Sequence, residues 1–131
     1  MTTITIDSRQ RIELIEITGE VRAAIGAAGI REGLAVVYTP HTTAAITINE
    51  NADPDVACDM VAALNKLVPF ADHYRHAEGN SAAHVKSTLV GASETLIVAG
   101  GAPVLGTWQG IYFCEFDGPR RRQVHVRVVG A

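Results

Sequence analysis

The sequence predicts a single α+β domain over residues 1–131, in which strands outnumber helices. Residues 123–128 alternate valine with polar side chains, which is the pattern of a strand with one buried face. Asp53-Pro54 is a strong helix start, because aspartate caps free amides and proline is tolerated in the first turn. Glycine- and proline-containing turns separate such segments. The expected order is two strands, one helix, two strands, two helices and three strands.

The first half of the chain is expected to contribute four strands in two pairs, at residues 2–6, 10–15, 33–39 and 43–49. The turn Asp7-Ser8 joins the first pair, and Pro40-His41 joins the second pair, which is predicted to be a hairpin. Between the pairs, residues 18–28 carry an apolar stripe at helical spacing. Thr18 is expected to cap this helix and Gly29 to end it.

The second half is expected to contain two helices and then strands. The first helix runs from Asp53-Pro54 to Pro69 and is predicted to bury Val56, Met60, Ala63 or Leu64, and Leu67 along one stripe. The second helix spans residues 81–90 and is closed by Gly91. Strands are then predicted for the segments 93–98, 103–105, 109–116 and the valine-rich C-terminal run.

Composition narrows the class of protein. The chain is 47% hydrophobic and 19% charged, which excludes a disordered segment, and its net charge of -3 gives no general attraction to nucleic acid or membrane surfaces. No apolar run approaches the roughly 20 residues of a membrane span. The two cysteines, Cys58 and Cys114, are predicted to be buried and reduced, and no secretory signal opens the sequence, so a cytoplasmic location is expected. Nucleotide-binding glycine motifs and the G-x-S-x-G motif are absent.

Histidines and acids cluster in two segments. Residues 49–55 hold two amides and three acids, and residues 73–84 hold three histidines and Glu78, while His41 lies in another connection. Neutral imidazole is the usual ligand of zinc-like ions, so the cluster suggests an open metal site. Each residue also has a plainer explanation, with Asp53 as a helix cap and each histidine as a hydrogen-bonded loop residue.

Two further features suggest a ligand pocket. Trp108, the only tryptophan, lies between Thr107 and Gln109 and is either an aromatic wall with polar anchors or a buried strand residue. Residues 120–122 are three arginines after an acidic turn. They either hold a phosphate or diphosphate or keep a sheet edge solvated.

Several blocks together resemble one known family. They are His41-Thr-Thr-Ala-Ala-Ile-Thr-Ile-Asn-Glu-Asn-Ala-Asp-Pro-Asp-Val56, Tyr74-x-His76, Glu78-Gly79, Ala83-His84-Val85-Lys86-Ser87 and Leu105-Gly-Thr-Trp-Gln-Gly110. The chain resembles the YjbQ-like family, whose members carry the label secondary thiamine-phosphate synthase enzyme. The resemblance implies two small packed sheets with about three helices, a homotrimer around a threefold axis, and His41, His76 and His84 as the metal ligands.

The resemblance also implies a transferase that couples hydroxymethylpyrimidine diphosphate to thiazole phosphate, as a weak or secondary activity beside another physiological substrate. A divalent metal ion, zinc-like or magnesium with a diphosphate, is the expected cofactor. The expected acid–base groups are Glu50, Glu78 and Glu115. The expected substrate-binding residues are Asn49, Asn51, Asp53, Thr107, Trp108, Gln109, Arg120 and Arg121. The alternatives are a trimeric metal- or ligand-binding protein without catalysis, and a polar cluster that only stabilises the trimer.

Overall fold

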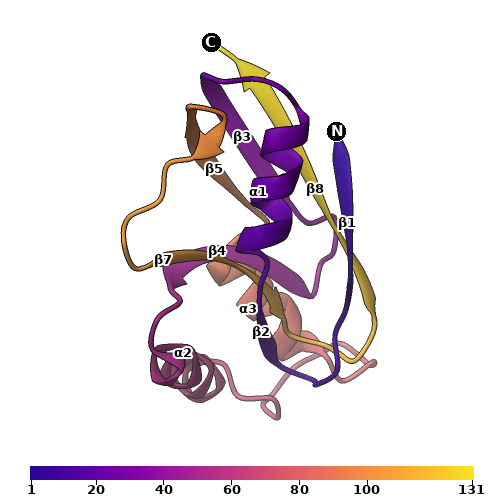
Figure 1. Ribbon diagram of the computed structural model, residues 1–131. Helices are drawn as coiled ribbons and strands as arrows, with labels where there is room; N and C mark the ends of the chain where they lie inside the picture. Colours follow the sequence, from indigo (N-terminus) through magenta and orange to yellow (C-terminus); the bar gives the residue numbers. More distant parts are fainter.

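The computed structural model describes residues 1–131 and confirms an α+β fold with two antiparallel sheets and three helices (Figure 1). The five-stranded sheet has the order β1-β8-β3-β5-β6, and the three-stranded sheet has the order β2-β7-β4. The elements in chain order are β1 (Thr2–Asp7), β2 (Glu13–Glu16), α1 (Thr18–Ala27), β3 (Gly33–Tyr38), β4 (Ala44–Glu50), α2 (Pro54–Leu67), α3 (Ser81–Val90), β5 (Ser93–Ala99), β6 (Ala102–Pro103), β7 (Gln109–Glu115) and β8 (Arg121–Gly130).

The main core lies where α1 and one face of the three-stranded sheet meet the inner face of the five-stranded sheet (Figure 1). Ile46 and Phe113 enter this core, whereas their neighbours Ala45 and Cys114 face a second, smaller cluster against α3. Because the first half of β4 and the middle of β7 are buried on both faces, residues 44–46 and residues 111–114 are continuous apolar runs rather than alternating ones. None of the helices is long and apolar enough to cross a membrane.

The predicted hairpin over residues 33–49 is wrong. β3 pairs with β5 and β8, whereas β4 pairs with β7 in the other sheet. The first two strands are separated in the same way, since β1 pairs with β8 and β2 pairs with β7. Strand-forming patterns identify these segments correctly but contain no information about their partners, which lie far away in the chain. The connection that carries His41 therefore passes between the two sheets.

The ends of the helices agree in part with the prediction. Asp53 caps α2, accepting a hydrogen bond from the Asp55 amide at 2.9 Å. Thr18 is not a cap, because its hydroxyl instead donates to Glu16 at 2.8 Å and accepts the Ile111 amide at 2.9 Å. The glycine at 91 has a φ of 101°, a conformation that an L side chain rarely adopts, and it ends α3 as expected. The predicted buried stripe of α2 is half-buried at Val56, Met60 and Leu64 and exposed at Leu67, because this helix lies at the periphery of the fold.

The two cysteines differ in environment. Cys114 is buried in the smaller cluster, where burial raises the pKa of its thiol to about 12. Cys58 is exposed on α2, so the prediction that it is buried is wrong. Both cysteines are free, as expected.

Lys86 on α3 is buried, with 2% of its surface exposed, and its amine donates to Asn65 Oδ1 of α2 at 2.5 Å. Burial lowers the pKa of this amine. Lys86→Met is expected to raise the free energy of unfolding by about 1–2 kcal/mol, because it removes a buried charge that has only an amide for a partner. Urea unfolding of the two proteins measures the effect. The exposed Lys66 gives the control Lys66→Met, and a loss of stability in Lys86→Met alone would contradict the expectation.

Candidate functional site

The three predicted histidines line one cavity of about 430 Å³, which we call the histidine pocket. Its charged and titratable lining residues are His41, His76, Glu78, His84, Asp117, Arg120 and Arg122. They come from four separate parts of the chain: the β3–β4 connection, the loop before α3, α3 itself, and the turn that leads into β8 together with the start of that strand. Because β3 and β4 belong to different sheets, the connection between them, which carries His41, passes beside α3.

The imidazole of His41 is held by the backbone of β8. Its Nε2 accepts a hydrogen bond from the Gln123 amide at 2.9 Å. Burial lowers the pKa of this imidazole, and the charge of Arg122 lowers it further. A neutral imidazole that accepts at Nε2 carries its proton on Nδ1, so this hydrogen bond assigns the tautomer. His41 therefore offers the pocket an N–H donor.

His76 and His84 lie beside each other in the same pocket. Their rings meet edge to face with centroids 5.6 Å apart, and His76 Nε2 lies 3.8 Å from Glu78 Oε2. Two imidazoles and a carboxylate form a donor set that suits zinc. His41 fits such a set less well, because one nitrogen accepts the Gln123 amide and the other carries the proton. No three histidine, cysteine or acidic side chains converge as ready metal ligands in this arrangement.

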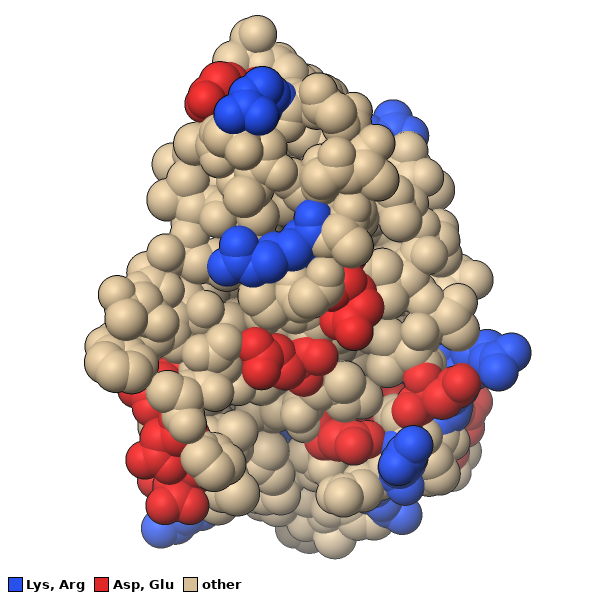
Figure 2. Space-filling model, in the orientation of Figure 1, with Lys and Arg blue, Asp and Glu red and all other residues tan.

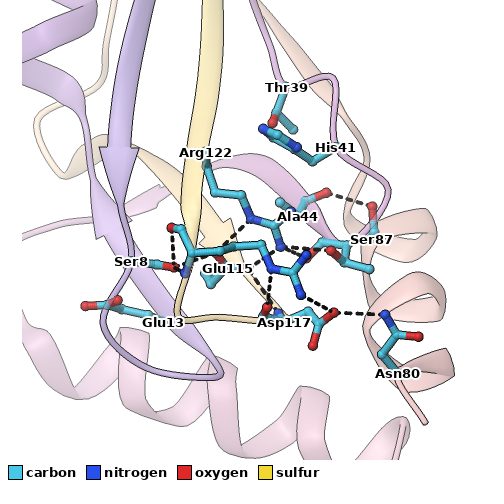
Figure 3. A network of polar contacts seen from close by, with 12 residues as sticks. Ser8, Glu13, Thr39, His41, Ala44, Asn80, Ser87, Glu115, Asp117 and Arg122 are labelled. Carbon is cyan, nitrogen blue, oxygen red and sulfur yellow. Dashed lines mark hydrogen bonds and ion pairs between the residues drawn. The ribbon is translucent and has the colours of Figure 1, made fainter. Parts of the chain in front are cut away.

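A buried ion pair adjoins the pocket through its arginine, which lines the cavity, and Figure 3 shows the contacts of this pair. Glu115 at the end of β7 is 0% exposed and Arg122 is 2% exposed. Arg122 donates to both carboxylate oxygens of Glu115 and also to the hydroxyl and carbonyl of Thr43. Ser8 Oγ donates to Glu115 at 2.6 Å, and the Asp117 amide donates at 3.0 Å. This network ties together both sheets and the connection that carries His41.

The hydrogen bonds to Glu115 determine its protonation. Burial alone raises the pKa of the carboxyl, but the bonds from Arg122, Ser8 and the Asp117 amide outweigh burial, and the net pKa is below the ordinary glutamate value. Both oxygens of this carboxylate are occupied within the protein. Glu115, predicted as an acid–base group, is therefore placed as the buried partner of Arg122, and Glu78 is the predicted acid–base residue that lines the pocket.

Arg120 and the start of α3 form the opposite wall. Arg120 is half-exposed and pairs with Asp117 at 3.1 Å, and Asp117 accepts a second hydrogen bond from Asn80 Nδ2 at 2.9 Å. Asn80 occupies the N-cap of α3 without capping it, and its Oδ1 is buried with no hydrogen-bond partner. Asn80 and the guanidinium of Arg120 thus line this end of the pocket together, just before the ten-residue α3 begins.

The other predicted binding residues lie at the far end of the three-stranded sheet. Ala44 pairs with Glu115 near the histidine pocket and Glu50 pairs with Gln109, so the two ends are about 20 Å apart at the usual rise per residue. The structure places six predicted residues at this far end: Asn49, Glu50, Asn51, Thr107, Trp108 and Gln109. Asp53 lies just beyond them as the cap of α2.

Several residues at this far end make contacts within the protein that explain their presence without a ligand. Asn51 Nδ2 donates to Glu16 at 2.8 Å, and its side chain lies so close to Gly110 that a Cβ there would meet it at 2.7 Å. Gln109 accepts the Gly106 amide at 2.8 Å. The sequence allowed Trp108 to be either an aromatic pocket wall or a buried strand residue. Its side chain is 62% exposed, so the second interpretation is wrong.

Arginine 121 is also outside the pocket. Successive side chains of a strand point to opposite faces, so Arg122 faces the pocket whereas Arg121 is exposed and pairs with Asp7 at 2.9 Å. Arg122 was predicted only as one of three arginines that hold a phosphate or keep a sheet edge solvated, and Asp117 and Asn80 were not predicted as site residues. Strand alternation was the available signal for Arg122, but no pattern in the chain points to the other two. On the face shown in Figure 2, basic and acidic side chains are interspersed, without a continuous basic tract.

Comparisons with known proteins identify relatives over nearly the whole chain. The sequence model described as "UPF0047 protein YjbQ-like" matches residues 2–131. The UPF0047 protein YugU of Bacillus subtilis is 54% identical over 129 residues, which cover 98% of each chain. The UPF0047 protein MJ1081 of Methanocaldococcus jannaschii is 53% identical over 125 residues, covering 95% of this chain and 91% of the relative.

Solved structures share the fold. The crystal structure of an uncharacterised YjbQ/UPF0047 protein of Clostridium acetobutylicum has a TM-score of 0.97 at 48% identity, covering 98% of this chain and all of the other. A YbjQ-like protein of unknown function from Sulfolobus solfataricus has a TM-score of 0.96 at 30% identity, covering 99% and 96% of the two chains. The two-sheet architecture is therefore that of experimentally determined relatives.

Proposed function

The chain belongs to the YjbQ-like UPF0047 family, and from its histidine pocket we propose that it is an enzyme acting on a phosphorylated small heterocycle. The observation that carries this proposal is the convergence of three histidines and Arg120 on one cavity. Imidazoles transfer protons near neutral pH, and a guanidinium suits phosphate oxygens.

Each side chain of the pocket has a proposed role that follows from its position. Arg120 binds phosphate oxygens, with Asp117 releasing the guanidinium when the ligand enters. His41 donates from Nδ1 to the bound substrate, because its other nitrogen is held by the Gln123 amide. Glu78 and His84 are the acid–base candidates that line the cavity. The buried pair of Glu115 and Arg122 positions the wall behind them.

The predicted metal is retained as part of this proposal. His76, His84 and Glu78 would have to move together to hold a divalent ion, zinc-like or magnesium with a diphosphate, and Glu78 and His84 serve as acid–base groups only while that ion is absent. The ion would neutralise charge on a leaving diphosphate. A ligand role of His41 stays a prediction, and it requires the imidazole to leave the Gln123 amide. Formation of thiamine phosphate from hydroxymethylpyrimidine diphosphate and thiazole phosphate is the reaction that the family resemblance suggests, as a secondary transferase activity.

We further propose that the protein is a homotrimer that uses the outer face of the five-stranded sheet. α1 covers the inner face of this sheet, and the outer face exposes large apolar side chains: Leu34, Val36, Ile97 and Val129. Neighbouring strands bring Leu34 opposite both Ile97 and Val129, so these side chains form one continuous patch. A patch of this kind on a soluble domain is typical of an interface.

A binding protein without catalysis is the second candidate. It is favoured by the placement of the predicted acids, because Glu115 is fully occupied and Glu50 lies at the far end of the sheet. Glu78 is then the single glutamate among the pocket's lining residues.

The test compares His84→Ala with the wild type in metal content and in pyrophosphate release from the two thiamine precursors. The enzyme proposal expects turnover to fall by about 10²–10⁴-fold in His84→Ala, the usual contribution of a positioned acid or base. His73→Ala is the matched control, because His73 is an exposed loop residue that does not line the pocket. Unchanged turnover in His84→Ala would refute the assignment. Metal and pyrophosphate binding without any turnover would instead establish the second candidate.

A further inference from the structure

A second hollow of about 470 Å³ adjoins the histidine pocket. The two cavities share four lining residues, namely Pro40, His41, Thr42 and His84. The two histidines therefore stand at the junction of the two hollows. Each hollow alone has the size of a small-ligand site.

The two hollows differ in charge. The histidine pocket has Arg120, Arg122, Glu78 and Asp117 in its lining. The second hollow has no acid, lysine or arginine, and its own lining residues are Tyr38, Thr39, Ser87, Thr88 and Ala92. A charged ligand group therefore finds charged partners in the histidine pocket, whereas the second hollow suits an uncharged group.

The second hollow also has free surfaces for a ligand. The hydroxyls of Thr39 and Ser87 are already bonded to the carbonyls of Gln123 and Ala44. Thr42 and Thr88 are exposed, and 43% of Tyr38 is exposed at the end of β3. A phenol ring and two threonines supply an apolar surface for a ring and hydroxyls for its polar substituents.

We propose that the site takes a two-part ligand, with a phosphoryl group in the histidine pocket and an uncharged ring in the hollow formed by Tyr38, Thr42 and Thr88. This inference rests on the proposed function, since it assumes that the histidine pocket binds phosphate. It adds the second subsite and places the bond between the two parts of the ligand beside His41 and His84. Tyr38 is thus the residue that selects the ring.

The test uses two phosphonates with the same charged group, methylphosphonate and benzylphosphonate, and measures their dissociation constants by titration calorimetry. Wild-type protein is expected to bind benzylphosphonate about tenfold more tightly, because only that ligand places a ring on Tyr38. Tyr38→Ala is expected to remove the preference and to leave methylphosphonate affinity unchanged. Arg120→Ala is expected to weaken both ligands to a similar extent.

The control is Val36→Ala, which alters the same outer sheet face two residues away without lining the hollow. If a change in assembly caused the effect of Tyr38→Ala, Val36→Ala would show it too. Val36→Ala is instead expected to keep the tenfold preference for benzylphosphonate over methylphosphonate. Equal affinity of the wild type for both phosphonates, or equal weakening of both by Tyr38→Ala, would overturn the second subsite and leave phosphate binding intact. Failure of both phosphonates to bind would overturn the proposed function together with this inference.

Discussion

Arg122→Met is expected to lower the free energy of unfolding by about 3–5 kcal/mol, the usual cost of removing one partner from a buried ion pair. The substitution leaves the Glu115 carboxylate, which is 0% exposed, without its two guanidinium hydrogen bonds. It also removes the donors to Thr43, which anchors the connection between the sheets. Urea unfolding monitored by the fluorescence of Trp108 and by circular dichroism measures the change.

The neighbouring arginine provides the control. Arg121 makes an exposed pair with Asp7, so Arg121→Met is expected to leave the unfolding midpoint nearly unchanged. The double variant Arg122→Met with Glu115→Leu is expected to recover part of the lost stability, because it leaves no unpaired buried charge. Similar effects of Arg121→Met and Arg122→Met would contradict the role assigned to the buried pair.

The same pair has a defined pH dependence. The pKa of Glu115 is lower in the folded protein than its ordinary value, so the unfolded chain binds the proton more readily. Its contribution to stability is therefore complete above the ordinary glutamate pKa of about 4.3 and is lost as the pH falls through the lower folded value. Urea unfolding of the wild type and of Glu115→Gln at several pH values measures this effect. The difference between their free energies of unfolding is expected to shrink as the pH falls below the ordinary glutamate pKa.

Ile97→Glu is expected to convert the proposed trimer into a monomer. Ile97 is 62% exposed in the apolar outer face, opposite Leu34, and a carboxylate there would be buried without a partner on assembly. Sedimentation equilibrium is expected to give the mass of three chains for the wild type and of one chain for the variant. Circular dichroism should be unchanged, since the side chain does not enter the core.

Leu67→Glu is the matched control for this experiment, because Leu67 is 75% exposed at the end of α2 and lies outside the apolar sheet face. It is expected to keep the mass of the wild type. A trimeric Ile97→Glu protein would show that another surface makes the interface. A monomeric wild type would refute the trimer itself.

Much of the candidate site could be predicted because its histidines are in short, distinctive segments. The family resemblance implies His41, His76 and His84 as the site histidines, and all three line one pocket. The residues of the Asn49–Asp53 segment and those around Trp108 have equally distinctive patterns, and they also lie close together, but at the opposite end of β4 and β7. Sequence motifs therefore identified two groups of neighbouring residues, but they did not show that the two groups form separate sites at opposite ends of the same strands.

The sequence by itself determined the elements and the family. Period-two valines predict β8, the Asp53-Pro54 start predicts α2, and the motif blocks predict the YjbQ-like fold, because each of these signals is contained in one local segment. Only the tertiary structure decided which strands pair, that Arg122 rather than Arg121 faces the pocket, and that Glu115 and His41 Nε2 are already occupied. Those outcomes depend on contacts such as Ser8 with Glu115 and Gln123 with His41, which join residues more than 80 positions apart in the chain.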